Sequence, residues 1–308
     1  MLLITGNGRK RMKTSLRNFS YKEATAVLFM LPALLLHLCI VTLPSLSTIY
    51  LSLFKWNGIG KPKYIGLDNF RQIFTEDYVI LRAFLNNIRW TLIFITVPIV
   101  LSLIVAIIVC QVKKGQMLYR TVFFLPYVLS AAIAGKIWAT FYSPYFGLGL
   151  VFRNLGLNSL AEVLWLGDPK IALYSVAFVD NWHWWGFVMV LFIAALHQID
   201  NGLYEAAKVE GANRVQEFWH ITIPGVKPTL VFIIMLTLMW SFLTFDYVWI
   251  MTMGGPGQAT EVMSTWMYKC AFINYRAGYG NAICVLQSFI VLVFFGINQY
   301  LRKRTGDI

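Results

Sequence analysis

The chain has 308 residues, of which 58% are hydrophobic and 13% are charged, and its mean hydropathy is +0.64. Because a soluble domain carries about 25% charged residues, this composition excludes an ordinary soluble protein and indicates an integral membrane protein. The net charge of +12 does not indicate a nucleic-acid partner, since the Lys and Arg residues lie at the ends of apolar runs rather than in one basic groove.

Six apolar runs are long enough to cross a membrane, which takes about 20 residues. The run at 27–53 follows a basic segment, is longer than a signal-peptide core and lacks a small-residue cleavage site, so we interpret it as a retained anchor. The sequence predicts an all-α integral membrane protein with a basic tail at 1–26, a six-helix domain at 27–301 and a basic tail at 302–308. The expected spans are 27–53, 90–112, 119–142, 171–196, 229–253 and 282–301.

The connections between these spans contain two recognisable features. The segment 143–170 is rich in Gly and Pro, and we expect it to hold one short helix near Leu150 to Leu164. The cluster Gly254-Gly255-Pro256-Gly257, between the last two spans, predicts a turn.

The distribution of Lys and Arg predicts the orientation. If the N-terminus is cytoplasmic, the inside segments hold 15 bases and the outside segments hold 10 over a greater length. The positive-inside rule therefore favours a cytoplasmic location for both termini. The loop at 201–226 is then also cytoplasmic.

That loop contains Glu205 to Pro224, the only long polar segment between two strongly apolar runs. Glu205-Ala206-Ala207 are good helix formers, and we place the acid in the first turn of a helix, where negative charge is favoured. Gly211 costs a helix roughly 1 kcal/mol against Ala, so it predicts a bend. Val215 to Trp219 can form a second short helix. The segment therefore predicts a helix-turn-helix elbow.

The spacing from Glu205-Ala206-Ala207 through Gly211 to Ile223-Pro224 resembles the EAA loop of permease subunits of binding-protein-dependent ABC importers. Ile223 stands where the family usually has Leu, which conserves volume. Further segments, in order along nearly the whole chain, are similar to those of the sugar-permease branch: Trp56-Asn57-Gly58, Gly66-Leu67-Asp68-Asn69-Phe70, Phe123-Phe124-Leu125-Pro126, Trp165-Leu166-Gly167-Asp168-Pro169 and Gly254-Gly255-Pro256-Gly257.

This resemblance implies an ABC importer type I permease architecture in the bacterial cytoplasmic (inner) membrane. It implies a second homologous permease subunit, two ATPase subunits that dock on the cytoplasmic elbows, an extracytoplasmic solute-binding protein and a sugar cargo moved by alternating access. ATP and magnesium belong to the partner ATPases, and we expect no cofactor on this chain. The residues that would contact the ATPase are Glu205, Ala206, Ala207, Glu210, Gly211, Ala212 and Arg214.

Three alternatives stay open at this point. One is an importer permease whose cargo is a polyol or a glycerol phosphate. The others are a membrane-embedded enzyme, or a membrane anchor or sensor without transport. A P-loop GxxxxGK[ST] is absent from the sequence, so we expect no ATP hydrolysis by this chain and no enzyme activity. An intramembrane hydrolase would need clustered acids, a nucleophile with its base, or metal ligands.

The Cys and His residues do not form such a cluster. Cys39, Cys110, Cys270 and Cys284 lack CxxC spacing, and the four His residues are equally scattered. We therefore expect no disulfide framework and no metal site.

Among the charges within the predicted spans we single out Lys136 and Asp246. Charges in hydrocarbon cost about 3 kcal/mol or more, so they usually face a cavity or a partner. They lie six and seven residues, respectively, before the outer ends of their predicted spans, so they can share one depth. Two interpretations stay open, an ion pair between them or a position along the solute path.

Aromatic and amide side chains accompany these charges. Stacked aromatics with a few polar groups suit sugars, which have apolar faces and hydroxyl rims, although each aromatic is also typical of helix packing or of a membrane interface. The candidate solute-pathway residues are Trp240, Phe245, Trp249, Asn181, Trp182 and Trp185, together with Lys136 and Asp246.

Overall fold

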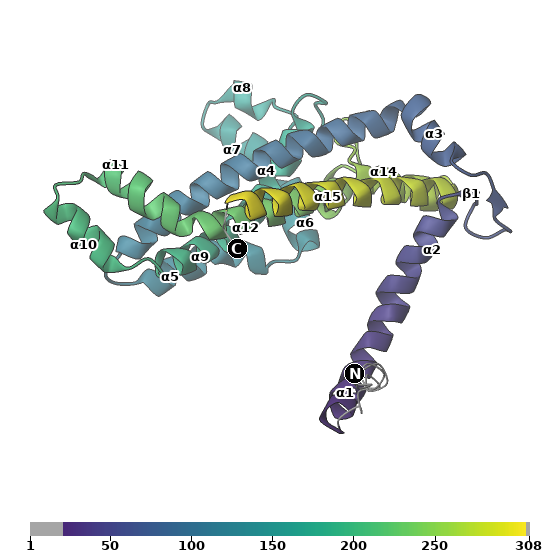
Figure 1. The fold of residues 1–308 in the computed structure, drawn as a ribbon. Helices are drawn as coiled ribbons and strands as arrows, with labels where there is room; N and C mark the ends of the chain where they lie inside the picture. The colour runs from purple at the N-terminus through teal and green to yellow at the C-terminus, as the bar shows by residue number, and fades with distance from the viewer. Residues whose placement is uncertain (1–20, 306–308) are drawn as a thin grey trace, which may run out of the picture. The chain divides into compact units, whose positions relative to one another are not determined.

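The structure is a computed structural model that describes residues 21–305 (Figure 1). Residues 1–20 and 306–308, which belong to the two predicted basic tails, lie outside the described residues. The chain divides into two compact units, Met1–Tyr50 and Leu51–Ile308, and each is described by itself.

The first unit is helical throughout its described part. It contains α1 (Tyr21–His37), η1 (Leu38–Thr42) and most of α2 (Leu43–Leu51). Together they form a run, Thr25–Leu51, that is long and apolar enough to cross a membrane and has no buried residue in its most apolar window. The first predicted span is therefore confirmed. A helix that is apolar on every face is suited to lipid or to another membrane helix.

The second unit contains four further helical runs of membrane-spanning length, Tyr78–Gln111, Ala172–Leu196, Arg214–Leu243 and Ala277–Ile297. They correspond to α4 (Tyr78–Gln111), α9 (Ala172–Leu196), the continuous run of α11 (Arg214–Glu217), η2 (Phe218–Thr222) and α12 (Ile223–Leu243), and α15 (Ala277–Thr305). The second, fourth and sixth predicted spans are confirmed, but α4 begins well before residue 90. It begins there because the Asp77 side chain accepts hydrogen bonds from the backbone N–H groups of Val79 and Ile80.

The third predicted span, expected as one helix over 119–142, is broken. It consists of α5 (Gln116–Val128) and α6 (Ala131–Phe141), which meet at an angle of 92°. Leu129 has an extended backbone, and the Ser130 hydroxyl accepts from the Ile133 N–H to begin α6. Local capping chemistry thus ends one helix and begins the next.

The fifth predicted span, expected over 229–253, is also wrong in its bounds. Its helix begins earlier, with α11 (Arg214–Glu217) and η2 (Phe218–Thr222) running into α12 (Ile223–Leu243). The helix then stops, and after Thr244 and Phe245 a short helix, α13 (Asp246–Met251), begins.

The main core lies where α4, α9 and α12 pack together. Its buried members include Trp90 and Phe94 of α4, Met189 and Phe192 of α9, and Ile233 of α12. A smaller core joins α3 (Asp68–Thr75), α4, α14 (Met263–Tyr268) and α15 through Ile73, Ile80, Met263, Tyr279 and Ile283.

Short elements complete the second unit. A two-stranded antiparallel hairpin, β1 (Phe54–Lys55) with β2 (Lys63–Tyr64), pairs Phe54 with Tyr64 and adds four strand residues to the predicted all-α class. The single helix expected near 150–164 is two helices, α7 (Leu148–Asn154) and α8 (Asn158–Ala161). One further turn, η3 (Lys269–Ile273), precedes α15.

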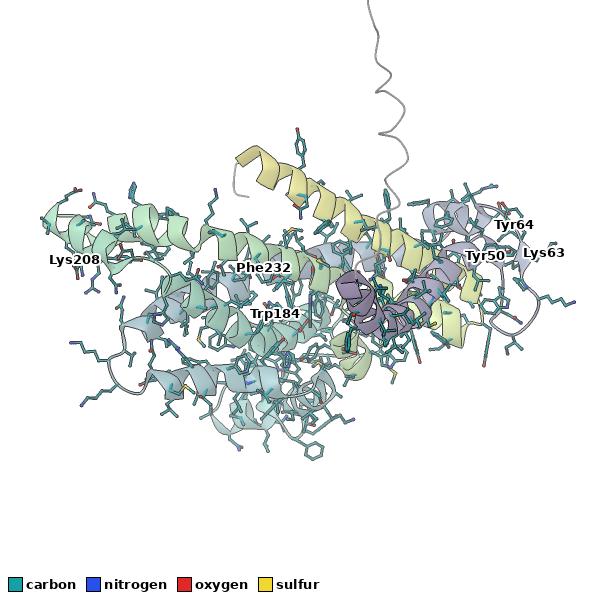
Figure 2. All side chains as sticks on the ribbon, turned by 60° about the horizontal axis from the view of Figure 1, so that its bottom comes forward. Tyr50, Lys63, Tyr64, Trp184, Lys208 and Phe232 are labelled. Atoms are coloured by element: carbon teal, nitrogen blue, oxygen red, sulfur yellow. The ribbon has the colours of Figure 1, made fainter. Side chains whose placement is uncertain are left out.

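Within this unit the polar elbow and the hairpin lie at opposite ends. Figure 1 places α10 (Asn201–Val209) and α11 at one end of the long helices and β1 and α3 at the other. Figure 2 shows the same separation between Lys208 on the elbow and Lys63 and Tyr64 on the hairpin.

Candidate functional site: a polar elbow and two broken spans

The first arm of the elbow is α10. It begins at Asn201, where the Asp200 side chain accepts a hydrogen bond from the Gly202 N–H at 2.9 Å. Glu205 is therefore the fifth residue of α10, and the expectation that it lies in the first turn is wrong. The Glu205 side chain is nevertheless exposed on the elbow, so a partner protein can still contact it.

The bend predicted at Gly211 is confirmed. Gly211 has φ of +80°, in the left-handed region, and an added Cβ would meet no atom within 4 Å. The Ala212 N–H donates to the Ala207 carbonyl at 2.9 Å, which closes the end of α10. Glycine is needed here for its backbone freedom rather than for lack of space.

The second arm begins directly after the bend. The Asn213 side chain accepts from the Gln216 N–H at 2.9 Å, and the Gln216 side chain accepts from the Asn213 N–H at 2.8 Å. This capping box starts α11 one residue before the predicted Val215. The two arms are joined by the hydroxyl groups of Tyr204 and Thr222, 3.0 Å apart. The predicted second short helix is confirmed, and it continues into α12.

The arms enclose a cavity of about 500 Å³ that is lined by Ala206, Ala207, Glu210, Gly211 and Glu217, among others. Of the residues predicted to contact an ATPase, Ala207 and Ala212 are half-buried, and the others are exposed: Glu205, Ala206, Glu210, Gly211 and Arg214. The elbow also exposes large apolar side chains, namely Val209 (90%), Val215 (65%) and Trp219 (60%). Apolar side chains among exposed charges are typical of a protein contact surface.

The break between α12 and α13 leaves carbonyl groups without helical partners, and side chains of other helices bind them. The Asn87 amide of α4 donates to the Ser241 carbonyl at 2.9 Å, and the Gln287 amide of α15 donates to the Phe242 carbonyl. The same Asn87 side chain accepts from the Met263 N–H at 2.9 Å. In a membrane a broken helix persists only when such partners are present.

The break between α5 and α6 is held in the same way. The imidazole Nε2 of His183 lies 2.9 Å from the Leu129 carbonyl oxygen. The ring of His183 also contacts Tyr127 before the break and Tyr247 of α13, at centroid distances of 5.4 and 5.9 Å. Helices α6 and α13 pack on each other, so His183 of α9 connects both broken spans.

Lys136 and Asp246 lie just after these two breaks, on α6 and α13. Both side chains are exposed in this chain, and the described residues contain no ion pair between them. The structure therefore does not contain the ion pair of the first interpretation. The solute-path interpretation stays a prediction.

The predicted aromatic residues fall into separate groups rather than one site. The rings of Phe245 and Trp249 stack next to Asp246 in the sequence, with their centroids 5.5 Å apart. Trp240 is 54% exposed, and its ring centroid lies 5.0 Å from that of Trp184. The other predicted members pack inside the helix bundle: Trp182 contacts Trp138, Trp185 contacts Phe123, and the Asn181 amide donates to the Ala177 carbonyl.

Sequence reasoning missed Asp180, which lies within the predicted fourth span. This half-buried carboxylate on α9 is within electrostatic range of Asp246 and Tyr247. The signal was present, because an acid inside an apolar run is as informative as Asp246. Asp180 therefore joins Asp246 as a candidate solute-pathway residue.

The turn predicted at Gly254 to Gly257 is confirmed and encloses a buried carboxylate. Glu261 is fully buried and forms an ion pair with Lys269. Gly254 has φ of +82°, and a Cβ there would lie 2.1 Å from the Glu261 carboxylate. The Asn86 amide of α4 donates to the Glu261 backbone carbonyl at 2.9 Å and fixes the loop against the bundle.

Comparison with known proteins agrees with this architecture. Residues 88–307 match the family described as "Binding-protein-dependent transport system inner membrane component". The chain is 37% identical over 283 residues to the "Probable ABC transporter permease protein YurN" of Bacillus subtilis, covering 91% of this chain and 96% of the relative. It is 33% identical over 279 residues to the "Diacetylchitobiose uptake system permease protein NgcF" of Streptomyces coelicolor, covering 86% and 78%.

A solved structure has the same fold. A chain of the bacterial alginate ABC transporter, in complex with alginate pentasaccharide-bound periplasmic protein, superposes with a TM-score of 0.82 at 22% identity, covering 92% of this chain and 96% of that one. The match to the family extends over more than half of the chain and includes both broken spans and the elbow. This chain therefore belongs to the family of inner-membrane components of binding-protein-dependent transport systems, as an ABC transporter permease.

Proposed function

We propose that this chain is a transmembrane subunit of an ATP-driven importer whose cargo is a mono- or oligosaccharide. The observation that carries the proposal is the exposed elbow around Gly211, with its cavity and its exposed Val209, Val215 and Trp219. A permease whose sequence has no P-loop needs such a surface if a partner subunit is to hydrolyse ATP for it. We assign the cytoplasmic side to the elbow on the basis of the asymmetry in Lys and Arg.

The sugar cargo is supported by two lines of argument. Relatives of this chain carry names that refer to diacetylchitobiose and to starch degradation products. The carboxylates of Asp180 and Asp246 can accept hydrogen bonds from sugar hydroxyl groups, and the exposed face of Trp240 can stack on a sugar ring. The complete importer, in this proposal, contains a second permease, two ATPase subunits and an extracytoplasmic binding protein.

The test begins with affinity purification of the full-length chain from its native membranes. We expect an ATPase, a second permease and a binding protein to copurify. Proteoliposomes of that complex should hydrolyse ATP faster in the presence of the binding protein and its sugar, and should accumulate the sugar. If the partners copurify but ATP hydrolysis is stimulated by a polyol or a glycerol phosphate and by no sugar, the proposed cargo is wrong and the importer assignment stands.

Orientation has its own test. A cysteine at Val209, which is 90% exposed at the elbow, should react with a membrane-impermeant thiol reagent in inside-out vesicles and not in intact cells. A cysteine at Ile59, 85% exposed near the hairpin, is the matched control and should show the opposite pattern. Labelling of the Val209 cysteine from outside intact cells would reverse the proposed orientation.

A further inference from the structure

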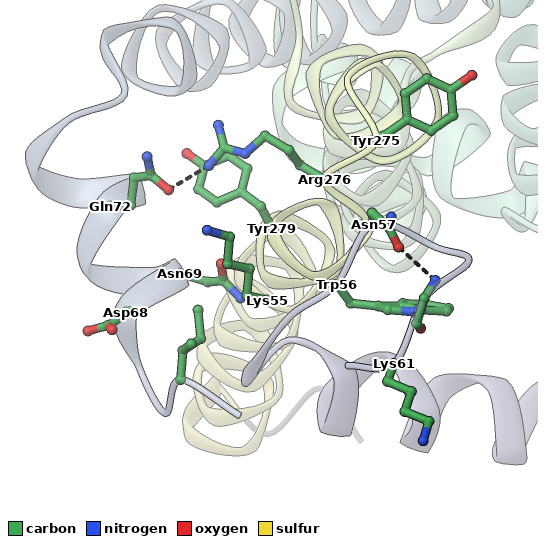
Figure 3. A pocket seen from close by; sticks show the side chains of 12 residues that line it. Lys55, Trp56, Asn57, Lys61, Asp68, Asn69, Gln72, Tyr275, Arg276 and Tyr279 are labelled. Atoms are coloured by element: carbon green, nitrogen blue, oxygen red, sulfur yellow. Dashed lines mark hydrogen bonds between the residues drawn. The ribbon is translucent and has the colours of Figure 1, made fainter. Parts of the chain in front are cut away.

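A second cavity, of about 610 Å³, lies at the end of the second unit opposite the elbow (Figure 3). It is formed by the β1–β2 hairpin, α3 and the residues that begin α15. Each of these segments adjoins the end of a candidate membrane span: one span ends at Leu51, the next begins at Tyr78 and the last begins at Ala277. The cavity therefore lies at the depth of the membrane–water interface, where lipid headgroups are found.

The cavity is lined by three cationic side chains, Lys55, Lys61 and Arg276, and by one acid, Asp68. Within the described part of the chain, neither the Lys55 nor the Lys61 side chain has an ion-pair or hydrogen-bond partner. Asp68 points away from Arg276 in Figure 3. The cavity therefore carries an excess of positive charge, which favours the binding of an anion.

Arg276 is held in position by two neighbours. Its guanidinium group donates to the Gln72 side chain and lies 4.2 Å from the centre of the Tyr279 ring. The Tyr279 hydroxyl in turn donates to the Asp77 carboxylate at 2.6 Å. A guanidinium group has five N–H donors, so most of them stay available. A fixed planar fork of donors matches the oxygen atoms of a phosphate.

The opposite wall of the cavity is equally fixed. The Trp56 indole N–H donates to the Gly60 carbonyl at 2.7 Å. The Asn57 side chain accepts from the N–H groups of Ile59 and Gly60, which closes the turn (Figure 3). Trp and Tyr are enriched at the headgroup level of membranes, where their rings are half in water. The wall therefore presents an interfacial aromatic beside the cations.

We propose that this cavity binds the phosphate of an anionic phospholipid headgroup, with Lys55, Lys61 and Arg276 as its ligands. The guanidinium fork of Arg276 and the two ammonium groups match such a headgroup phosphate in charge and in hydrogen-bond geometry. Its depth favours a lipid over a soluble phosphate, because the acyl chains of a bound lipid would continue along the membrane spans. This site is distinct from the elbow and from the broken spans.

The test is a titration of the full-length chain, purified in a neutral detergent, with dioctanoyl phosphatidylglycerol, followed by native mass spectrometry. We expect saturable binding of at least one lipid. The double variant Lys55→Gln/Lys61→Gln should bind about tenfold more weakly or worse, as expected for the loss of hydrogen bonds to a charged group. Neither lysine side chain has a partner within the described residues, so this double variant should fold with an unchanged thermal midpoint.

The matched control is Lys113→Gln/Lys114→Gln, which removes two exposed lysines at the turn between α4 and α5. It should bind phosphatidylglycerol as the wild type does. Dioctanoyl phosphatidylcholine, which has no net charge, should bind weakly to all three proteins. Equal affinity of the pocket variant and the control variant would overturn the proposal. Binding of glycerol 3-phosphate as tight as that of the lipid would overturn the lipid assignment in favour of a soluble phosphate.

Discussion

The side-chain amide of Asn87 on α4 donates to the backbone carbonyl of Ser241 on α12 at 2.9 Å, in the last turn before that helix breaks. Asn87 is fully buried, and its side-chain oxygen accepts from the Met263 N–H at the start of α14. One side chain therefore binds both the last turn of α12 and the first turn of α14. Without it, a backbone acceptor and a backbone donor would be buried without partners.

Replacement of Asn87 by Leu should destabilise the chain. A buried polar group left without its partner costs about 1–3 kcal/mol, and this substitution leaves two such groups. We expect a lower midpoint of thermal unfolding in detergent. Thr96→Val on the same helix is the control, since the exposed Thr96 hydroxyl bonds only within α4. An Asn87→Leu variant as stable as the control would contradict the assigned role of the amide.

Substitution at Gly211 should impair coupling to the ATPase according to backbone preference rather than size. A left-handed conformation costs an L-residue about 1–2 kcal/mol, but Asn tolerates it better than a β-branched residue. Gly211→Val should therefore reduce copurification of the ATPase and sugar uptake, while Gly211→Asn should retain more of both. Gly202→Ala, in α10 but without a positive φ, is the control. Normal sugar uptake by the Gly211→Val variant would show that Gly211 is not part of the coupling surface.

The ion pair of Glu261 and Lys269 should show strong non-additivity. Glu261 is fully buried, so Lys269→Met leaves an unpaired charge, for which about 3–5 kcal/mol is expected. The double variant Glu261→Gln/Lys269→Met removes that charge and should be more stable than Lys269→Met alone. Thermal unfolding of the wild type, the two single variants and the double variant measures the coupling. Additive effects of the two substitutions on the thermal midpoint would show that the two charges do not stabilise each other.

Lys136 and Asp246 should affect transport rather than stability. Both are exposed and unpaired in the described chain, so Lys136→Met and Asp246→Leu should each leave the thermal midpoint of the complex nearly unchanged, with additive effects in the double variant. Each should alter sugar-stimulated ATP hydrolysis or uptake. Phe178→Leu, an exposed residue of α9, is the control. Unchanged uptake in both charge variants would exclude them from the solute path.

Features that depend on local sequence were predicted correctly. The apolar runs identify the spans because about 20 apolar residues suffice to cross a bilayer. The bend at Gly211 and the turn at Gly254 were predicted because a glycine in a polar or turn-rich segment marks a left-handed backbone. Helix ends were less accurate, since caps such as Asp77 and Asp200 lie outside the apolar and motif positions that guided the prediction.

The tertiary structure alone decided where the spans break. Nothing between Leu243 and Asp246 signals an interruption, and the helix can end there because Asn87 and Gln287 supply partners for its free carbonyls. The tertiary structure likewise decided that Lys136 and Asp246 form no ion pair among the described residues, because each lies on a short helix whose direction is set by the preceding break.

The interfacial cavity likewise depends on tertiary structure. Gln72 and Arg276 are 204 residues apart in sequence and meet only when the beginning of α15 packs beside α3. The sequence by itself thus determined which segments enter the membrane and which segment turns back as an elbow, because hydrophobicity and glycine act locally. Hydrogen bonds and charges brought together from distant helices decided the breaks, the exposed charges and the cavity, because those partners are defined only once the helices pack.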